Sequence, residues 1–143
     1  MSENLVASTS ISINKPKNKV WRALVTPEAI KQYMFGADVK SGWTQGSVIT
    51  WQGEFKGNKY EDKGVILKID PEEKLQYSHF SPLAGKADTP ENYHTVTIGL
   101  SGNGPETAVS LSQDNNATPA ARDESTKNWN VMLEGLKKYV EKS

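Results

Sequence analysis

The sequence predicts an α+β domain in which a curved antiparallel β-sheet wraps around one long C-terminal helix. First, apolar and polar residues alternate in residues 5–13 and in several segments between residues 37 and 111, which is typical of half-buried strands. Second, residues 129–140 repeat apolar side chains at the spacing of one helical face. Third, two proline-led segments predict two short helices after the first strand. The 143 residues suffice for a single domain, residues 1–143.

The first strand and the two short helices form the N-terminal part of this prediction. Residues 5–13 place apolar side chains on one face and serines on the other. Pro16 suits the first turn of a helix, where its missing N–H costs nothing. Thr26 is the expected N-cap of the second helix, with Pro27 at its first position, and Gly36 is expected to end it.

Between residues 37 and 111 the sequence predicts six antiparallel strands joined by turns. Val65, Leu67 and Ile69 share one face of the third of these strands. Residues 54–63 mix both charges, which is typical of a solvated hairpin and also suits a surface that docks a partner. The longest irregular connection is residues 81–90. We place the strands at residues 37–40, 48–55, 60–70, 75–80, 93–100 and 107–111.

The C-terminal segment is the most regular element. Its apolar face comprises Trp129, Met132, Leu133, Leu136, Tyr139 and Val140. Because such a helix must bury its apolar stripe, and an antiparallel sheet buries one face, we expect the sheet to close around the helix. A gap between a curved sheet and one helix is a usual place for a small-molecule pocket.

Composition excludes several classes of protein. Lys plus Arg and Asp plus Glu are 17 each, so the net charge is zero and bulk attraction to nucleic acid is not expected. The absence of cysteine removes disulfides and thiolate metal sites. No apolar run approaches the roughly 18 residues of a membrane span, and the first residues do not form a signal peptide. We therefore expect a cytoplasmic protein, monomeric or weakly dimeric.

Four segments in order resemble a known superfamily: Pro16–Leu24 with Thr26–Glu28, then Gly42–Ser47, Gly64–Tyr77 and Trp129. Together they resemble the SRPBCC (START/Bet v 1-like) superfamily, and most of all the branch named after the C-terminal domain of the activator of Hsp90 ATPase. The resemblance implies a helix-grip fold enclosing a hydrophobic cavity. Relatives in the superfamily include lipid carriers, flavonoid and plant-hormone binders, polyketide cyclases and co-chaperone domains.

The aromatic residues supply the candidate site. We expect a small hydrophobic ligand, lipid-, flavonoid- or polyketide-like, in a cavity entered between residues 33–36 and the 81–90 loop. The alternative for each ring is that it is simply core. The candidate cavity residues are Tyr33, Met34, Trp51, Tyr77, His79, Phe80, Tyr93, Trp129, Met132 and Leu133.

Catalysis has weaker support in the sequence. His79 and His94 are the only histidines, too few for a metal centre, so we expect no metal or other cofactor and assign no catalytic residue. One alternative is a polyketide cyclase or dehydratase with His79 or His94 as acid–base, although no carboxylate that would orient either ring is recognisable. The other is an Hsp90-type co-chaperone or protein-interaction module of the stress response, using the outer face of the sheet or the charged hairpin.

Overall fold

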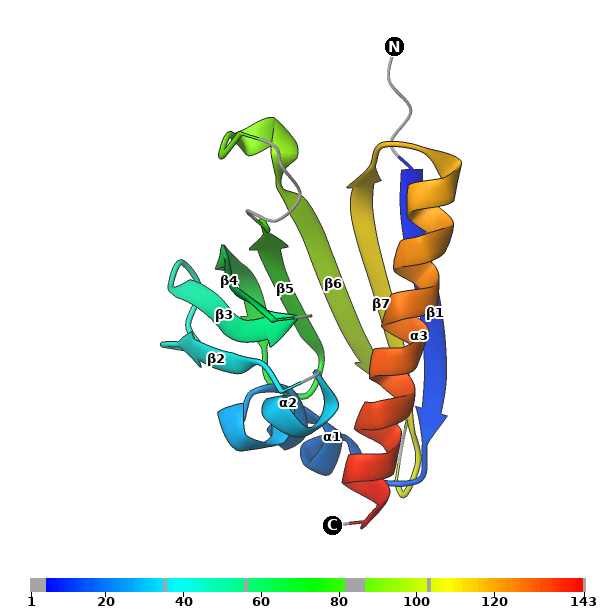
Figure 1. Ribbon diagram of the computed structural model, residues 1–143. Helices are drawn as coiled ribbons and strands as arrows, with labels where there is room; N and C mark the ends of the chain where they lie inside the picture. The colour runs from blue at the N-terminus through cyan, green and yellow to red at the C-terminus, as the bar shows by residue number, and fades with distance from the viewer. Residues whose placement is uncertain (1–4, 35, 56, 82–86, 103, 143) are drawn as a thin grey trace.

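The computed structural model describes residues 5–34, 36–55, 57–81, 87–102 and 104–142, and these form one antiparallel sheet with helices on its concave side (Figure 1). The sheet has seven strands in the order β1-β7-β6-β5-β4-β3-β2. This confirms the predicted α+β helix-grip arrangement. In chain order the elements are β1 Leu5–Ile13, α1 Lys17–Leu24, α2 Pro27–Tyr33, β2 Asp38–Ser41, β3 Val48–Phe55, β4 Asn58–Asp70, β5 Lys74–His79, η2 Pro90–Asn92, β6 His94–Ser101, β7 Thr107–Asn116 and α3 Pro119–Lys142.

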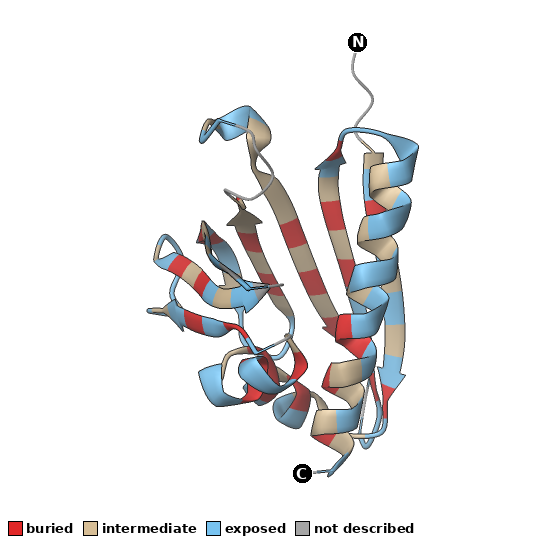
Figure 2. Ribbon diagram, viewed as in Figure 1, coloured by how far each residue is buried: buried red, intermediate tan, exposed pale blue. Residues whose placement is uncertain are grey.

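Helix α3 divides into two halves that differ in burial. Its buried residues, Met132, Leu133, Leu136 and Val140, all lie in the C-terminal half. That half packs on β1, α1 and α2, and Figure 2 shows red segments within it, whereas the first turns are mostly pale blue. The helix begins at Pro119, and the hydroxyl of Thr118 caps it by accepting the N–H of Ala121 at 3.0 Å. The inner face of the sheet is therefore tightly covered at one end only.

Strand β4 approaches β5 closely at Gly64. A Cβ atom there would lie 1.7 Å from the carbonyl oxygen of Ser78, so only glycine permits this approach. The N–H of Val65 donates to the Ser78 hydroxyl at 2.9 Å, and Lys63 pairs with Phe80 in an isolated bridge. Pairing of β4 with β5 therefore extends past Gly64 toward the start of β4.

The inner and outer faces of β4 do not follow a simple alternation of apolar residues along its sequence. Ile66 is fully buried on the inner face, whereas Val65 and Leu67 are exposed on the outer face. A register shift between Ile66 and Lys68 then turns Ile69 inward, opposite the buried Leu75 and against the core, so the prediction that Val65, Leu67 and Ile69 share one face is wrong. Asp62 lies directly opposite the buried Trp51 in the β3–β4 register, which places the carboxylate on the inner face.

Candidate functional site

A small apolar cavity lies where α2, α3 and the sheet meet. Five of the predicted residues line it, namely Tyr33, Met34, Trp51, Tyr77 and Met132. Its volume is about 20 Å³, roughly the space of one water molecule. The aromatic rings predicted as a cavity wall are thus closely packed here, and Trp51 and Tyr77 contact each other with centroids 5.2 Å apart. We call these five residues the aromatic floor.

The two tyrosines of the aromatic floor differ in how their hydroxyls are used. Tyr33 donates to the carbonyl oxygen of Ala23 at 2.9 Å. The hydroxyl of Tyr77 has no hydrogen-bond partner among the described residues, and only 4% of the residue is exposed. Burial raises the pKa of both hydroxyls well above the usual value, so both stay protonated across the physiological range. Tyr77 therefore offers an uncommitted polar group beside an apolar cavity.

A carboxylate and an imidazole form a pair next to this floor, toward the open end. The carboxylate Oδ2 of Asp62 lies 3.0 Å from Nε2 of His79, and the ring of Trp51 packs edge-on against His79 with centroids 5.1 Å apart. Both side chains are largely covered, with 16% of Asp62 and 27% of His79 exposed. The second oxygen of Asp62, Oδ1, is buried and has no hydrogen-bond partner among the described residues.

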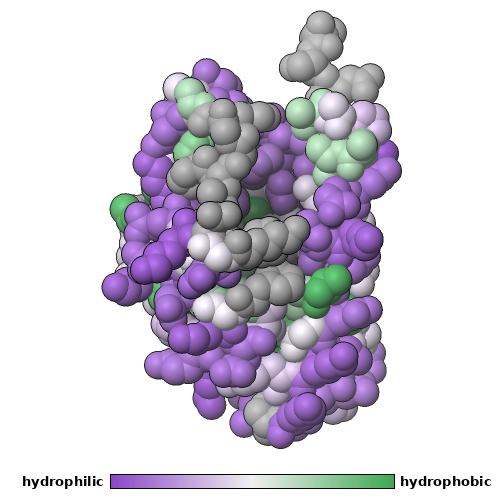
Figure 3. Space-filling model, viewed as in Figure 1, coloured by the Kyte–Doolittle hydropathy of each residue, from purple (hydrophilic) through white to green (hydrophobic). Residues whose placement is uncertain are grey.

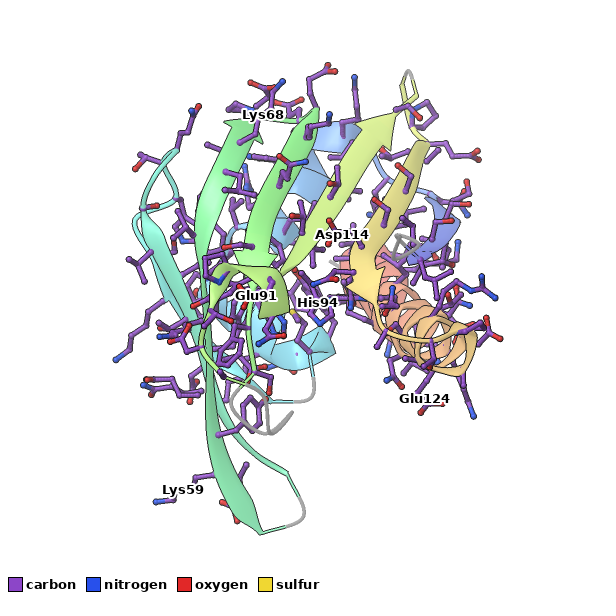
Figure 4. All side chains as sticks on the ribbon, turned by 90° about the horizontal axis from the view of Figure 1, so that it is seen from above. Lys59, Lys68, Glu91, His94, Asp114 and Glu124 are labelled. Atoms are coloured by element: carbon purple, nitrogen blue, oxygen red, sulfur yellow. The ribbon has the colours of Figure 1, made fainter. Side chains whose placement is uncertain are left out.

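His94 completes the polar wall. It lies opposite His79 in the β5–β6 register, and the two ring centroids are 6.4 Å apart. Its Nδ1 is 2.9 Å from the carbonyl oxygen of Asp114, and Figure 4 shows both residues at the end of the sheet where α3 begins. Because a carbonyl accepts only, Nδ1 of His94 carries a proton, and in the neutral ring Nε2 is the nitrogen with the lone pair. We call Asp62, His79 and His94 the polar wall.

The remaining predicted residues lie outside this group. Phe80 and Tyr93 stack on each other, with centroids 5.1 Å apart. The hydroxyl of Tyr93 donates to Asp88 at 2.6 Å, and Asp88 also pairs with Lys63. Lys63 and then Tyr93 hold the pKa of the Asp88 carboxyl below its usual value. This cluster fastens the end of the 81–90 connection, so it is a structural part of the rim.

Trp129 and Leu133 belong to the packing of α3. Leu133 is buried in the core. Trp129 is half-buried, and its Nε1–H donates to Oε1 of the buried Gln113 on β7 at 2.5 Å. Of the predicted entrance, residues 35 and 82–86 lie outside the described residues. Figure 3 shows a hollow in this face of the molecule, between the upper part of α3 and the strands opposite.

Sequence reasoning missed Asp62, the carboxylate that orients His79. It lies in the charged stretch 54–63, which predicts a solvated hairpin. The usable signal is the alternation of Asp62 and Gly64 with Ile66, which puts all three on one face of β4. Among the described residues no group of three or more His, Asp or Glu side chains is arranged to hold a metal ion.

A curved antiparallel sheet closed over one long helix, with a mixed aromatic and polar inner wall, defines a protein of the helix-grip class, the SRPBCC superfamily. The sequence model of the family "Activator of Hsp90 ATPase homolog 1-like protein" matches residues 14–141, so the chain belongs to this family. A comparison with curated proteins found no match. None of the helices in the described residues has the length and apolar character needed to span a membrane.

Solved structures agree with this assignment. ChR145 from Cytophaga hutchinsonii is 55% identical, with a TM-score of 0.86 over 99% of this chain and 97% of that one. The Aha1 dimer from Colwellia psychrerythraea is 21% identical, with a TM-score of 0.72 over 95% and 96% of the two chains. CalU16 from Micromonospora echinospora is 19% identical, with a TM-score of 0.70 over 98% and 86%. The last two show likeness of fold.

Proposed function

We propose that the protein binds a small, largely apolar molecule between the sheet and α3, with the polar end of the ligand at the polar wall. The observation that carries the proposal is the largely covered polar wall next to the aromatic floor, at the end where α3 is not buried. A mostly apolar surface with a few polar groups is typical of small-molecule sites. Family membership supports the proposal, since the superfamily includes many such carriers.

Binding requires the aromatic floor to open. A cavity of about 20 Å³ is far below the roughly 300–1,000 Å³ of a usual ligand pocket. Met34 and Met132 line the cavity, and methionine side chains adapt to new shapes at low cost. A ligand that buries about 300 Å² of apolar surface gains roughly 7–8 kcal/mol from burial, before the costs of opening and immobilisation. We therefore expect modest affinity.

An amide-proton NMR titration tests the proposal. The panel comprises fatty acids, sterols, flavonoids and polyketide-like aromatics. We expect saturable shifts on the inner residues of β5 and β6 and around Met132, with little change on the outer face. Shifts from no member of the panel, or shifts spread evenly over both faces, would contradict interior binding.

A pair of variants locates the site. Met132→Trp fills the cavity. Val131→Trp adds the same ring at the preceding residue of α3, which is 49% exposed. The first should abolish the saturable shifts and the second should keep them. Since overpacking costs about 1–3 kcal/mol, folding of both variants is verified from their amide spectra before titration.

A co-chaperone role is the second candidate, favoured by membership in a family named for activation of the Hsp90 ATPase. Figure 4 places Lys59 on the β3–β4 hairpin, which projects from the sheet, and Lys68 toward the opposite end of β4. If the hairpin docks a chaperone, Lys59→Glu should reduce stimulation of Hsp90 ATP turnover and Lys68→Glu should not. Turnover unchanged by excess wild-type protein would exclude this role.

A further inference from the structure

The polar wall contains hydrogen-bond acceptors to which no described residue donates. Asp62 Oδ1 is buried without a donor among the described residues. Asp62 Oδ2 is a carboxylate oxygen, so the hydrogen bond to it uses the proton on Nε2 of His79, and in the neutral ring Nδ1 then carries a lone pair. In the same way, the hydrogen bond from Nδ1 of His94 to the carbonyl oxygen of Asp114 leaves Nε2 of the neutral His94 ring as an acceptor. Three acceptors therefore lie on one inner wall.

The buried oxygen Oδ1 of Asp62 is costly unless something donates to it. A buried acceptor that has lost water and gained no partner costs about 1–3 kcal/mol, and more when it is charged. A purely structural aspartate would gain from a second donor, and β4 and β5 supply none to Oδ1. The orphaned oxygen next to an oriented imidazole is typical of a site that is completed by a ligand.

From this wall we infer that the ligand carries an acidic hydroxyl, phenolic or enolic, that donates to Nδ1 of His79, with Asp62 as the positioning residue behind the ring. The inference rests on the proposed function and names its ligand class. Where the proton transfers fully, the ligand O–H bond breaks and the Nδ1–H bond forms. The electron pair stays on the ligand oxygen, and Asp62 stabilises the imidazolium.

The same argument excludes an ionised carboxylate as the preferred head group. A carboxylate has acceptors only, and at the wall it would face the charge of Asp62 and two nitrogen lone pairs. The aromatic floor next to His79, formed in part by Trp51 and Tyr77, suits a flat ring system. Hydroxylated aromatic molecules therefore fit the wall better than fatty acids do.

Three naphthalene probes test the inference in the full-length protein at mildly alkaline pH. They share one ring system and differ in head group: 2-naphthol, 2-methoxynaphthalene and 2-naphthoate. We expect 2-naphthol to bind about tenfold more tightly than the methyl ether, the value of one hydrogen bond to a polarised acceptor, and the carboxylate to bind weakest. Affinities are measured by fluorescence titration and checked by amide shifts.

Two variants assign the preference to the pair. His79→Phe should bind the methyl ether as wild type does and lose the preference for 2-naphthol. Asp62→Asn keeps the shape of the side chain and should reduce that preference severalfold. Its matched control is Glu61→Gln, the neighbouring carboxylate, which is exposed and accepts from Gln52. Glu61→Gln should leave all three affinities unchanged.

The outcomes distinguish failure of the acceptor site from failure of interior binding, the proposed function. Equal affinity for 2-naphthol and its methyl ether, or a preference that survives both His79→Phe and Asp62→Asn, overturns the acceptor site and leaves interior binding intact. Tightest binding of 2-naphthoate also overturns it, in favour of an anion site. Absence of binding by all three probes contradicts the inference and the proposed function together. Asp62→Asn gives the answer where His79→Phe does not fold.

Discussion

Raising the pH above 10 tests whether water is excluded from the tyrosine hydroxyls of the aromatic floor. An unfolded tyrosine ionises near pH 10.0, whereas burial raises the pKa of Tyr33 and Tyr77 in the folded protein. The unfolded state therefore loses protons first, so the stabilisation is complete below pH 10 and decreases as the pH rises above it. Each tyrosine contributes about 1.4 kcal/mol per pH unit. Together they should cost the folded state roughly 3 kcal/mol between pH 9 and 11.

Tyr77→Phe should roughly halve this loss. It removes a hydroxyl without a described partner, so stability at pH 8 should change little, whereas Tyr33→Phe also loses the hydrogen bond to Ala23, worth about 1 kcal/mol. The assay is urea unfolding at a series of pH values from 8 to 11.5. A pH slope identical in wild type and Tyr77→Phe would mean that the Tyr77 hydroxyl is solvated in the folded state, and the dry floor would be refuted.

Three further variants test the frame around the site by urea unfolding. Gly64→Ala should cost about 3 kcal/mol or more because its Cβ would collide with Ser78, whereas Gly99→Ala meets only a side-chain hydroxyl at 3.0 Å and should cost less; equal losses would contradict the close approach. Trp129→Phe should cost about 1–3 kcal/mol by leaving the Gln113 amide oxygen without its donor, and no loss would mean that water replaces the indole. Thr118→Ala should cost about 1 kcal/mol, and an unchanged midpoint would show that this cap is not needed.

The fold was predictable from the sequence because its determinants are local. The helical spacing of Met132, Leu133 and Leu136, and the proline at the start of α2, act within a few residues. Strand ends were harder, since β7 continues to Asn116 where the prediction ends at residue 111. The Asn116 amide donates to Leu5 and Gln113 and accepts from Ser125, and these long-range bonds hold a polar segment in the sheet. Such contacts leave no trace in local periodicity.

The site was less predictable than the fold for a related reason. His79 was identified as a candidate, but its partner belongs to another strand, and the sequence around Asp62 is charged on both sides. Only the register across β3 and β4, which places Asp62 opposite the buried Trp51, and the close approach of β4 to β5 at Gly64 reveal that Asp62 faces inward. Phe80 and Tyr93 were candidates for their aromatic character, yet they stack on each other at the rim. Residue type indicated aromatic surface, and register decided which part of it lines the interior.

The two halves of α3 separate stability from recognition in this fold. The buried half, with Leu133, Leu136 and Val140, joins the core cluster that holds the sheet. His79 and His94 are partly buried polar residues that lie opposite each other on β5 and β6. Substitutions in the polar wall should therefore alter ligand preference at little cost to folding, because few core contacts depend on it. Under the proposed function, changes to residues at the open end of the sheet would alter the preferred ligand while the core around α3 is kept.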